Sequence, residues 1–295
     1  NYLNAIDDFS KAIDLDPNIA EIYFSRGEAK RNLEDYQGAI NDLNKAIDLD
    51  PNFAEYFFER ANLKYISLDY QGAIDDCSKA NLLKPNSFYY LLSKKCKEHL
   101  GDIKGAIDEC SKGIQLKTFP NDILFKSRIR LKVRIDDYQS ALDDCNKLIE
   151  LHPNDFNGFN FRGNIKNILD EFTYAIDDYS KAINLFHKKY SNDNHFSELD
   201  KSELSDIYLN RGIAKFNLKD YKGAVDDFSK AIDLDPDETS LYEWRGYLRR
   251  YFLKEYKDAF DDYTKIIDLD PKNIEAIKSR AIINDKLKDY KGAVD

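Results

Sequence analysis

The chain has 295 residues, of which 42% are hydrophobic and 33% are charged, and its formal net charge is −10. It contains no run of about 18 apolar residues, so membrane insertion is not expected. Its acidic balance argues against nucleic acid as the main partner, because phosphate backbones are bound by excess Lys and Arg. The four cysteines lack C-x-x-C spacing, which predicts reduced thiols in a cytoplasmic protein.

The first predicted element is a helix that ends in the octapeptide SKAIDLDP at 10–17. The same octapeptide returns at 229–236, and NKAIDLDP stands at 44–51. An alanine column keeps a period of about 34 residues along the chain, except for one longer step between Ala175 and Ala224. The column consists of Ala5, Ala39, Ala73, Ala106, Ala141, Ala175, Ala224, Ala259 and Ala293. The period predicts tandem repeats with a single insertion.

Each period contains two stretches with helical spacing of apolar residues, separated by a short polar turn. All seven prolines fall at the junctions between periods, where they end the second helix. Small Gly or Ala side chains recur where the two helices would touch, and aromatic columns stand beside them. Examples of the aromatic columns are Tyr23, Phe57, Tyr90, Phe125, Phe159, Tyr208 and Tyr242.

This order of aromatic, small and proline positions in 34 residues resembles the tetratricopeptide repeat (TPR) family. The resemblance implies an all-α solenoid, in which antiparallel helix pairs form a right-handed superhelix. It also implies that the first helix of each pair lines a concave groove.

We expect a single array over 1–295 that belongs to a longer protein, because both ends cut a repeat. The insertion, at about 187–204, reads as a solvated loop, with DKSELSD at 200–206 capping the next helix. Tyr290 should start the last second helix. The expected segments are a half repeat at 1–19, full repeats at 20–53, 54–86, 87–121, 122–155, 156–189, 205–238 and 239–273, and a partial repeat at 274–295.

Carboxylate pairs such as Asp143/Asp144 recur on the second helices, and an arginine column that includes Arg128 recurs on the first helices. We expect the second Asp of each pair to bind an Arg of the same or the next repeat. As exposed pairs, these would contribute about 0–1 kcal/mol each.

The sequence has no phosphate-binding glycine loop, no nucleophile with a spaced His partner and no metal-ligand spacing. The Asp pairs follow the period, whereas a catalytic site would occur once. We therefore expect no cofactor, no metal and no enzymatic activity.

Three sets of residues on first helices are expected to face the groove. A basic set would hold acidic side chains, an asparagine set would hydrogen-bond a peptide backbone, and an aromatic set would hold an apolar anchor. A solvated polar helix face explains the asparagines equally well. The basic set is Lys95, Lys126, Arg130 and Arg134; the asparagine set is Asn157, Asn160, Asn164, Asn167 and Asn210; the aromatic set is Trp244, Tyr247 and Tyr251.

These patterns predict a scaffold for protein–protein interaction that holds an extended peptide or a partner helix, and they are compatible with membership of a larger complex. An alternative is that the repeats select substrates for a catalytic domain outside this sequence, as the resemblance to an asparagine-lined TPR array of the enzyme that adds N-acetylglucosamine to intracellular proteins implies.

Overall fold

The computed structural model describes residues 1–117, 121–190 and 197–292. Over these ranges the chain forms sixteen α-helices and one short π-helix, and no strand. The all-α fold of antiparallel helix pairs is therefore confirmed. The helices fall into two compact units, Asn1–Asp144 and Cys145–Asp295, and the boundary lies within one helix, α9.

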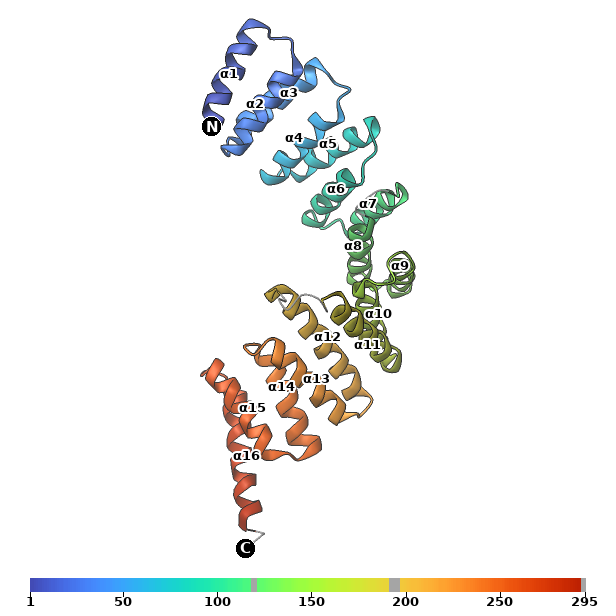
Figure 1. Cartoon of the computed structure of the whole chain (residues 1–295), viewed down its shortest axis with the longest axis vertical. Coiled ribbons are helices and arrows are strands. Elements are labelled where there is room, and N and C mark those ends of the chain that lie inside the picture. The colour runs from blue at the N-terminus through green and yellow to red at the C-terminus, as the bar shows by residue number, and fades with distance from the viewer. Residues whose placement is uncertain (118–120, 191–196, 293–295) are drawn as a thin grey trace. The chain divides into compact units, whose positions relative to one another are not determined.

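In the first unit, α2 packs against α3, α4 against α5 and α6 against α7 as antiparallel hairpins (Figure 1). The helices of this unit are α1 (Tyr2–Leu15), α2 (Ala20–Asn32), α3 (Tyr36–Leu49), α4 (Ala54–Ile66), α5 (Tyr70–Leu83), α6 (Ser87–His99), α7 (Ile103–Gln115), α8 (Asn121–Arg134) and the start of α9 (Tyr138–Leu151).

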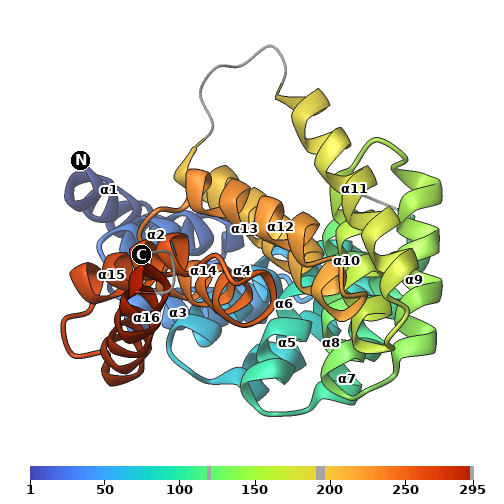
Figure 2. The same cartoon turned by 90° about the horizontal axis from the view of Figure 1, so that it is seen from below.

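In the second unit, α10 pairs with α11 and α12 pairs with α13, and Figure 2 shows α12 and α13 side by side. The helices of this unit are α10 (Phe156–Ile168), α11 (Phe172–Lys189), α12 (Glu198–Asn217), α13 (Tyr221–Leu234), α14 (Thr239–Leu248), the π-helix η1 (Arg249–Leu253), α15 (Tyr256–Leu269) and α16 (Ile274–Gly292).

The turn inside a hairpin is set by one residue in the left-handed region and one aspartate cap. In the α4–α5 hairpin, Leu68 has a φ of 65° and reverses the chain. Asp69 then accepts a hydrogen bond from the backbone N–H of Gly72, at 2.9 Å, and caps α5. The same cap is formed by Asp35, Asp102 and Asp220.

The alanine column lies at the helix contacts, as its period predicts. Ala39, Ala73, Ala106, Ala141, Ala175, Ala224 and Ala259 are all fully buried. A methyl group at these positions allows the two helix axes to approach closely, and large side chains from neighbouring helices fill the space around it. In the second unit these large side chains include Tyr179, Phe186 and Phe228, which are also fully buried.

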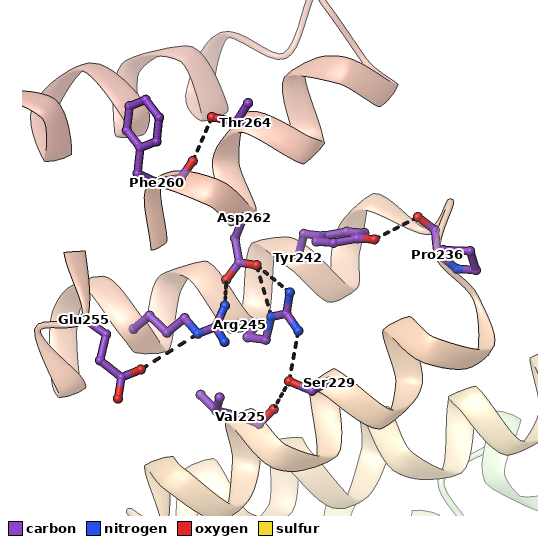
Figure 3. Close-up of polar contacts among 10 residues, drawn as sticks. Val225, Ser229, Pro236, Tyr242, Arg245, Glu255, Phe260, Asp262 and Thr264 are labelled. Carbon is purple, nitrogen blue, oxygen red and sulfur yellow. Dashed lines mark hydrogen bonds and ion pairs between the residues drawn. The ribbon is translucent and has the colours of Figure 1, made fainter. Parts of the chain in front are cut away.

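A buried ion pair, which we call the ionic clamp, joins the two helices of most repeats. Arg128 of α8 donates from Nη2 and Nε to Asp144 of α9, at 2.6 and 2.8 Å, and Lys132 contacts the same carboxylate at 2.7 Å. Arg128 also donates to the hydroxyl of Ser111 on α7, at 2.9 Å, which ties the repeat to the one before it. Equivalent clamps are Arg26–Asp42, Arg60–Asp76, Arg162–Asp178, Arg211–Asp227 and Arg245–Asp262 (Figure 3).

The predicted pairing of Arg with the second Asp is confirmed, but the expectation that these pairs are exposed is wrong. The aspartate side chains of the clamps are only 2–8% exposed. Each carboxylate faces the sister helix and accepts from two cations, so it is compensated as a buried charge must be. Hydrogen bonds with Asp42 and Asp178 raise the pKa of Arg26 and Arg162 above the ordinary value.

The expected loop at about 187–204 is wrong at both ends, because much of the insertion lengthens the flanking helices. Helix α11 continues to Lys189 and α12 begins at Glu198. The cap of α12 is Ser197 rather than the predicted 200–206 segment, since the Ser197 hydroxyl accepts from the backbone N–H of Asp200 and the Asp200 carboxylate accepts in return. The middle of the predicted loop lies outside the described residues.

Two further departures from the 34-residue rule occur near the C-terminus. An extra residue between α14 and α15 is absorbed by the π-turn of η1. Helix α16 runs without interruption to Gly292, so Tyr290 does not start a new helix as predicted.

Candidate functional site

A hollow with a volume of about 650 Å³ lies in the second unit, between α14, α15 and α16. Two of the predicted aromatic residues, Trp244 and Tyr247, form one wall. The other lining residues are Glu243, Tyr263, Asn273, Glu275, Ala276 and Ser279. We call this space the α14–α16 hollow.

The hollow exists because large and small side chains face each other across it. Trp244 and Tyr247 lie one turn apart on α14, so they project from the same face of the helix. Ala276 and Ser279 lie one turn apart on α16 and are too small to fill the space opposite the two rings. The result is an aromatic wall with room in front of it.

Trp244 has a packing role as well as a place in the wall. Its ring is partly buried and stacks on Phe228, with 6.0 Å between ring centroids, and it contacts Phe216 at 5.8 Å. Tyr247 is 40% exposed. Tyr247 is therefore accessible to a ligand, while Trp244 is held in the wall of the hollow by its contacts with Phe228 and Phe216.

Tyr251, the third predicted aromatic residue, lies in the π-turn beside the hollow. It is 53% exposed, its ring lies 4.9 Å from that of Tyr247, and the Arg250 guanidinium lies 4.5 Å from its centroid. Tyr247 and Tyr251 are four residues apart, a spacing that places side chains on the same face of a helix. Single π-turns inside helices are frequent at functional sites.

The charged lining residues of the hollow are acidic, while Arg250 interacts with the hydroxyl of the lining residue Tyr263. Glu243 and Glu275 are exposed lining residues, and no Lys or Arg is among the described lining residues. Asn273 donates to Glu243 at 3.3 Å, and Lys278, outside the hollow, lies 3.5 Å from Glu275. Burial raises the pKa of Tyr263, so its phenol is a neutral hydrogen-bonding group at neutral pH.

Sequence reasoning missed Glu243, Tyr263, Asn273 and Glu275. The signal for Glu243 was its place directly before Trp244 on a first helix. The other three residues come from the second helix of that repeat and from the partial repeat after it, so only the packing of α14, α15 and α16 brings them to the aromatic wall.

The asparagine set lies mainly on α10, and the structure divides it. Asn164 accepts from the Tyr179 hydroxyl at 2.8 Å and from Asn210 at 3.4 Å, so these two asparagines are drawn together and used internally. Asn157 donates to Asp155 at the start of α10. The side-chain oxygens of Asn160 and Asn167 are buried and have no hydrogen-bond partner among the described residues.

The basic set belongs to the first unit. Lys95 is exposed on α6, and Arg130 and Arg134 are exposed on α8. Lys126 is partly buried and lies 3.8 Å from Asp122. The asparagine and aromatic sets belong to the second unit.

The cysteines are buried core residues. Burial raises the pKa of Cys96 to about 11 and that of Cys110 to about 12, and it raises the pKa of Cys77 further. Thiols of this kind are not reactive nucleophiles. Among the described residues, no group of three or more His, Cys, Asp or Glu side chains is placed to hold a metal ion.

Comparisons with known proteins give short matches to repeat families. Residues 205–238 match the tetratricopeptide repeat model, and residues 27–65 match a TPR repeat model. Residues 138–165 match the model of the protein prenyltransferase alpha subunit repeat. No curated protein matches the chain.

Solved structures match over most of the chain. The C-terminal part of a TPR repeat-containing protein from Cytophaga hutchinsonii is 18% identical, with a TM-score of 0.61 over 95% of this chain and 94% of that one. A tetratricopeptide repeat protein from Parabacteroides merdae is 13% identical, with a TM-score of 0.54 over 90% and 98%.

A chain of the APC/C hetero-tetramer Cut9–Hcn1 is 14% identical, with a TM-score of 0.54 over 96% of this chain. The match spans about half of that chain, 52% of its length. At these low sequence identities, the structural matches show a shared fold alone.

No helix in the described ranges is both long and apolar enough to span a membrane. The helical hairpins, the buried alanine column and the repeat models agree, and the fold suits protein–protein interaction in general. The chain therefore contains tetratricopeptide repeats, matched at 27–65 and 205–238, within a fold shared with tetratricopeptide repeat proteins.

Proposed function

We propose that this chain is a non-enzymatic scaffold that binds a segment of a partner protein in the α14–α16 hollow. The observation that carries the proposal is the aromatic wall of Trp244 and Tyr247 beside the carboxylates of Glu243 and Glu275. Large aromatic residues at the edge of a hollow are typical anchors in protein interfaces.

The chemistry of the hollow favours an apolar side chain with a basic neighbour. The rings offer a surface for an aliphatic or aromatic anchor, and Glu243 and Glu275 attract a Lys or Arg beside it. In the first unit, the exposed Lys95 and Arg134 favour acidic side chains instead. The partner of the hollow is thus expected to be basic, whereas the sequence alone suggested an acidic partner.

The experiment is a selection of displayed random peptides against the intact chain. We expect enriched peptides to combine a large apolar residue with Lys or Arg, and to lose binding to Tyr247→Ala and to Glu275→Lys. Tyr174→Ala is the matched control, because Tyr174 is a 62% exposed tyrosine on α11, outside the hollow.

Peptides that bind Tyr247→Ala and Glu275→Lys as tightly as the unaltered chain would refute the proposal. Trp244→Ala is less informative, because the loss of its contacts with Phe216 and Phe228 also lowers stability.

A further inference from the structure

The ionic clamp lacks its arginine in one repeat of the first unit. Helix α6 carries Ser93 at the position of Arg60 in the preceding repeat and Arg128 in the following one. The other two components remain, since Lys97 lies 2.8 Å from Glu109, as Lys64 lies 2.8 Å from Asp76. Ser93 is 1% exposed, and its hydroxyl has no hydrogen-bond partner in the described chain.

An arginine in a complete clamp has three partners. The guanidinium of Arg128 lies over the ring of Phe125, at 5.4 Å, and donates to Asp144 on the next helix and to Ser111 on the preceding one. An aromatic ring, a carboxylate and a serine hydroxyl likewise surround Arg26, Arg211 and Arg245. At Arg60 and Arg162 the side-chain oxygens of Asn44 and Asn146 take the place of the hydroxyl.

All three partners of the missing arginine line one hollow. Tyr90 stands at the position of the ring, Glu109 at that of the carboxylate and Ser78 at that of the hydroxyl. The hollow between them has a volume of about 270 Å³, far above the ~30 Å³ share of one water molecule. We call it the Ser93 hollow, after the position of the missing arginine; Ser93 itself is not among the described lining residues. Its other lining residues are Asn81, Leu82 and Lys112.

The hydrogen-bonding groups of the Ser93 hollow are available to a ligand. Lys97 and Lys112 both contact Oε1 of Glu109, at 2.8 and 3.4 Å, while Oε2 has no hydrogen bond within the described ranges. The Ser78 hydroxyl donates to the carbonyl of Ile74 at 2.8 Å, which leaves its lone pairs to accept.

Ser111 shows that such a hydroxyl binds a guanidinium. It donates to the carbonyl of Ile107 at 2.8 Å, in the same way as Ser78, and it accepts from Arg128 at 2.9 Å. The Ser78 hydroxyl is therefore oriented to accept from a guanidinium, and its own chain has no arginine at the position that would donate to it.

Two residues at the rim also depart from the repeat. Asn81 stands where the other second helices carry isoleucine, and its side-chain oxygen accepts from the backbone of Asn86 at 3.2 Å. Leu82 is 79% exposed and stands where Asp48 stands in the preceding repeat. An exposed leucine at the mouth can cover the methylene stem of an entering side chain.

Lys112 does not exclude a cation from the Ser93 hollow. A lysine follows the clamp carboxylate by three residues in complete clamps too, as Lys45 follows Asp42. Lys112 is also neutralised by Asp108, at 2.7 Å.

We propose that the Ser93 hollow binds the guanidinium group of an arginine side chain presented by a partner segment. The ligand replaces the missing arginine: it stacks on Tyr90 and donates to Glu109 and to Ser78. A planar fork can make these contacts together, whereas the compact ammonium of lysine cannot. The site belongs to the first unit and is independent of the α14–α16 hollow.

The test is a ligand-observed NMR titration of the full chain with N-acetyl-arginine amide. The control ligand is N-acetyl-citrulline amide, which has the same shape without the charge. We expect saturable binding of the arginine compound only. Equal signals from both compounds, or no saturable binding, would overturn the proposal.

Ser93→Arg supplies the guanidinium from within the chain. It is expected to abolish binding of the arginine compound and to raise the melting temperature, while Lys95→Arg, on the exposed face of the same helix, changes neither. A folded Ser93→Arg variant that still binds the compound would contradict the assignment.

If Ser93→Arg does not fold, Glu109→Gln tests whether the Ser93 hollow binds the arginine compound. Removing the charge of the acceptor should weaken binding about tenfold, as for a lost hydrogen bond to a charged group. Unchanged affinity in a folded Glu109→Gln variant would refute the site.

Discussion

Arg245 and Asp262 form the same buried clamp as the other repeats, although seventeen residues rather than sixteen separate them. The π-turn at Arg249–Leu253 absorbs the extra residue. Arg249 then donates to Asp262 at 2.7 Å, in place of the lysine found in the other clamps. The ion pair is thus kept where the local helix geometry changes, although Nε and Nη2 of Arg245 both donate to Oδ1 of Asp262.

Removing a clamp arginine should destabilise the chain strongly. In Arg128→Ala, the Asp144 carboxylate, which is 8% exposed in the unaltered chain, loses two hydrogen bonds. We expect the free energy of unfolding to fall by about 3 kcal/mol, measured by urea denaturation. Arg134→Ala, an exposed arginine on the same helix, is the control and should change it by less than about 0.5 kcal/mol. Equal effects of the two substitutions would contradict the burial of the clamp.

The hairpin turn offers a stabilising substitution. Leu68 adopts a φ of 65° and is 70% exposed, so glycine relieves backbone strain and sacrifices little packing. We expect Leu68→Gly to raise the free energy of unfolding by about 1 kcal/mol. Gly101, with a φ of 77° in the next hairpin, provides the reverse test. Gly101→Ala should lower the melting temperature, and a loss of stability in Leu68→Gly would disprove the strain argument.

Two asparagines on α10 should respond in opposite ways. Asn164→Ala removes the acceptor of the fully buried Tyr179 hydroxyl and should cost about 1–3 kcal/mol. Asn160→Ala removes a buried oxygen without a partner and should leave stability unchanged or raise it. Thermal denaturation of the two variants distinguishes them. A larger loss in Asn160→Ala would show that its oxygen has a structural partner.

The buried thiols predict an alkaline loss of stability. An unfolded cysteine has a pKa of about 8.5, and burial raises that of Cys96 to about 11 and that of Cys110 to about 12. Below pH 8 both states hold the proton, so the full stabilisation is present. Between about pH 8.5 and 11 the unfolded state loses protons first, and each thiol lowers the free energy of unfolding by up to about 1.4 kcal/mol per pH unit.

The measurement is urea denaturation at pH 8 and pH 10, with the variant Cys96→Ala/Cys110→Ala as control. The alkaline loss should shrink in the variant, since Cys96 and Cys110 no longer ionise on unfolding. A loss that is equal in both proteins would show that these thiols do not cause it.

The repeat architecture was predictable because the same contacts recur in every period. The columns of Ala39 and Arg26 repeat at the spacing that the hairpins impose, so the pairing of Arg with Asp followed from the sequence. The burial of Asp42 could not be predicted from the sequence. An Asp among polar residues is expected to be exposed, and only the packing of the neighbouring helix buries it. The gap at Ser93 was visible as a break in the arginine column.

The insertion and the site were harder to predict. The polar segment that contains Ser197 and Asp200 reads as a loop by composition, but a capping box starts a helix there. The α14–α16 hollow depends on Ala276 and Ser279 lying opposite Trp244. That juxtaposition joins different repeats, and the spacing within one repeat does not reveal it.

The clamps also determine how the chain would respond to tension. Arg128 binds side chains on helices of two successive repeats. A pulling force would therefore be transmitted from one hairpin to the next through these hydrogen bonds and ion pairs. At Ser93 the arginine that would make this connection is missing. An arginine bound there would supply the missing ionic link between α5 and α6.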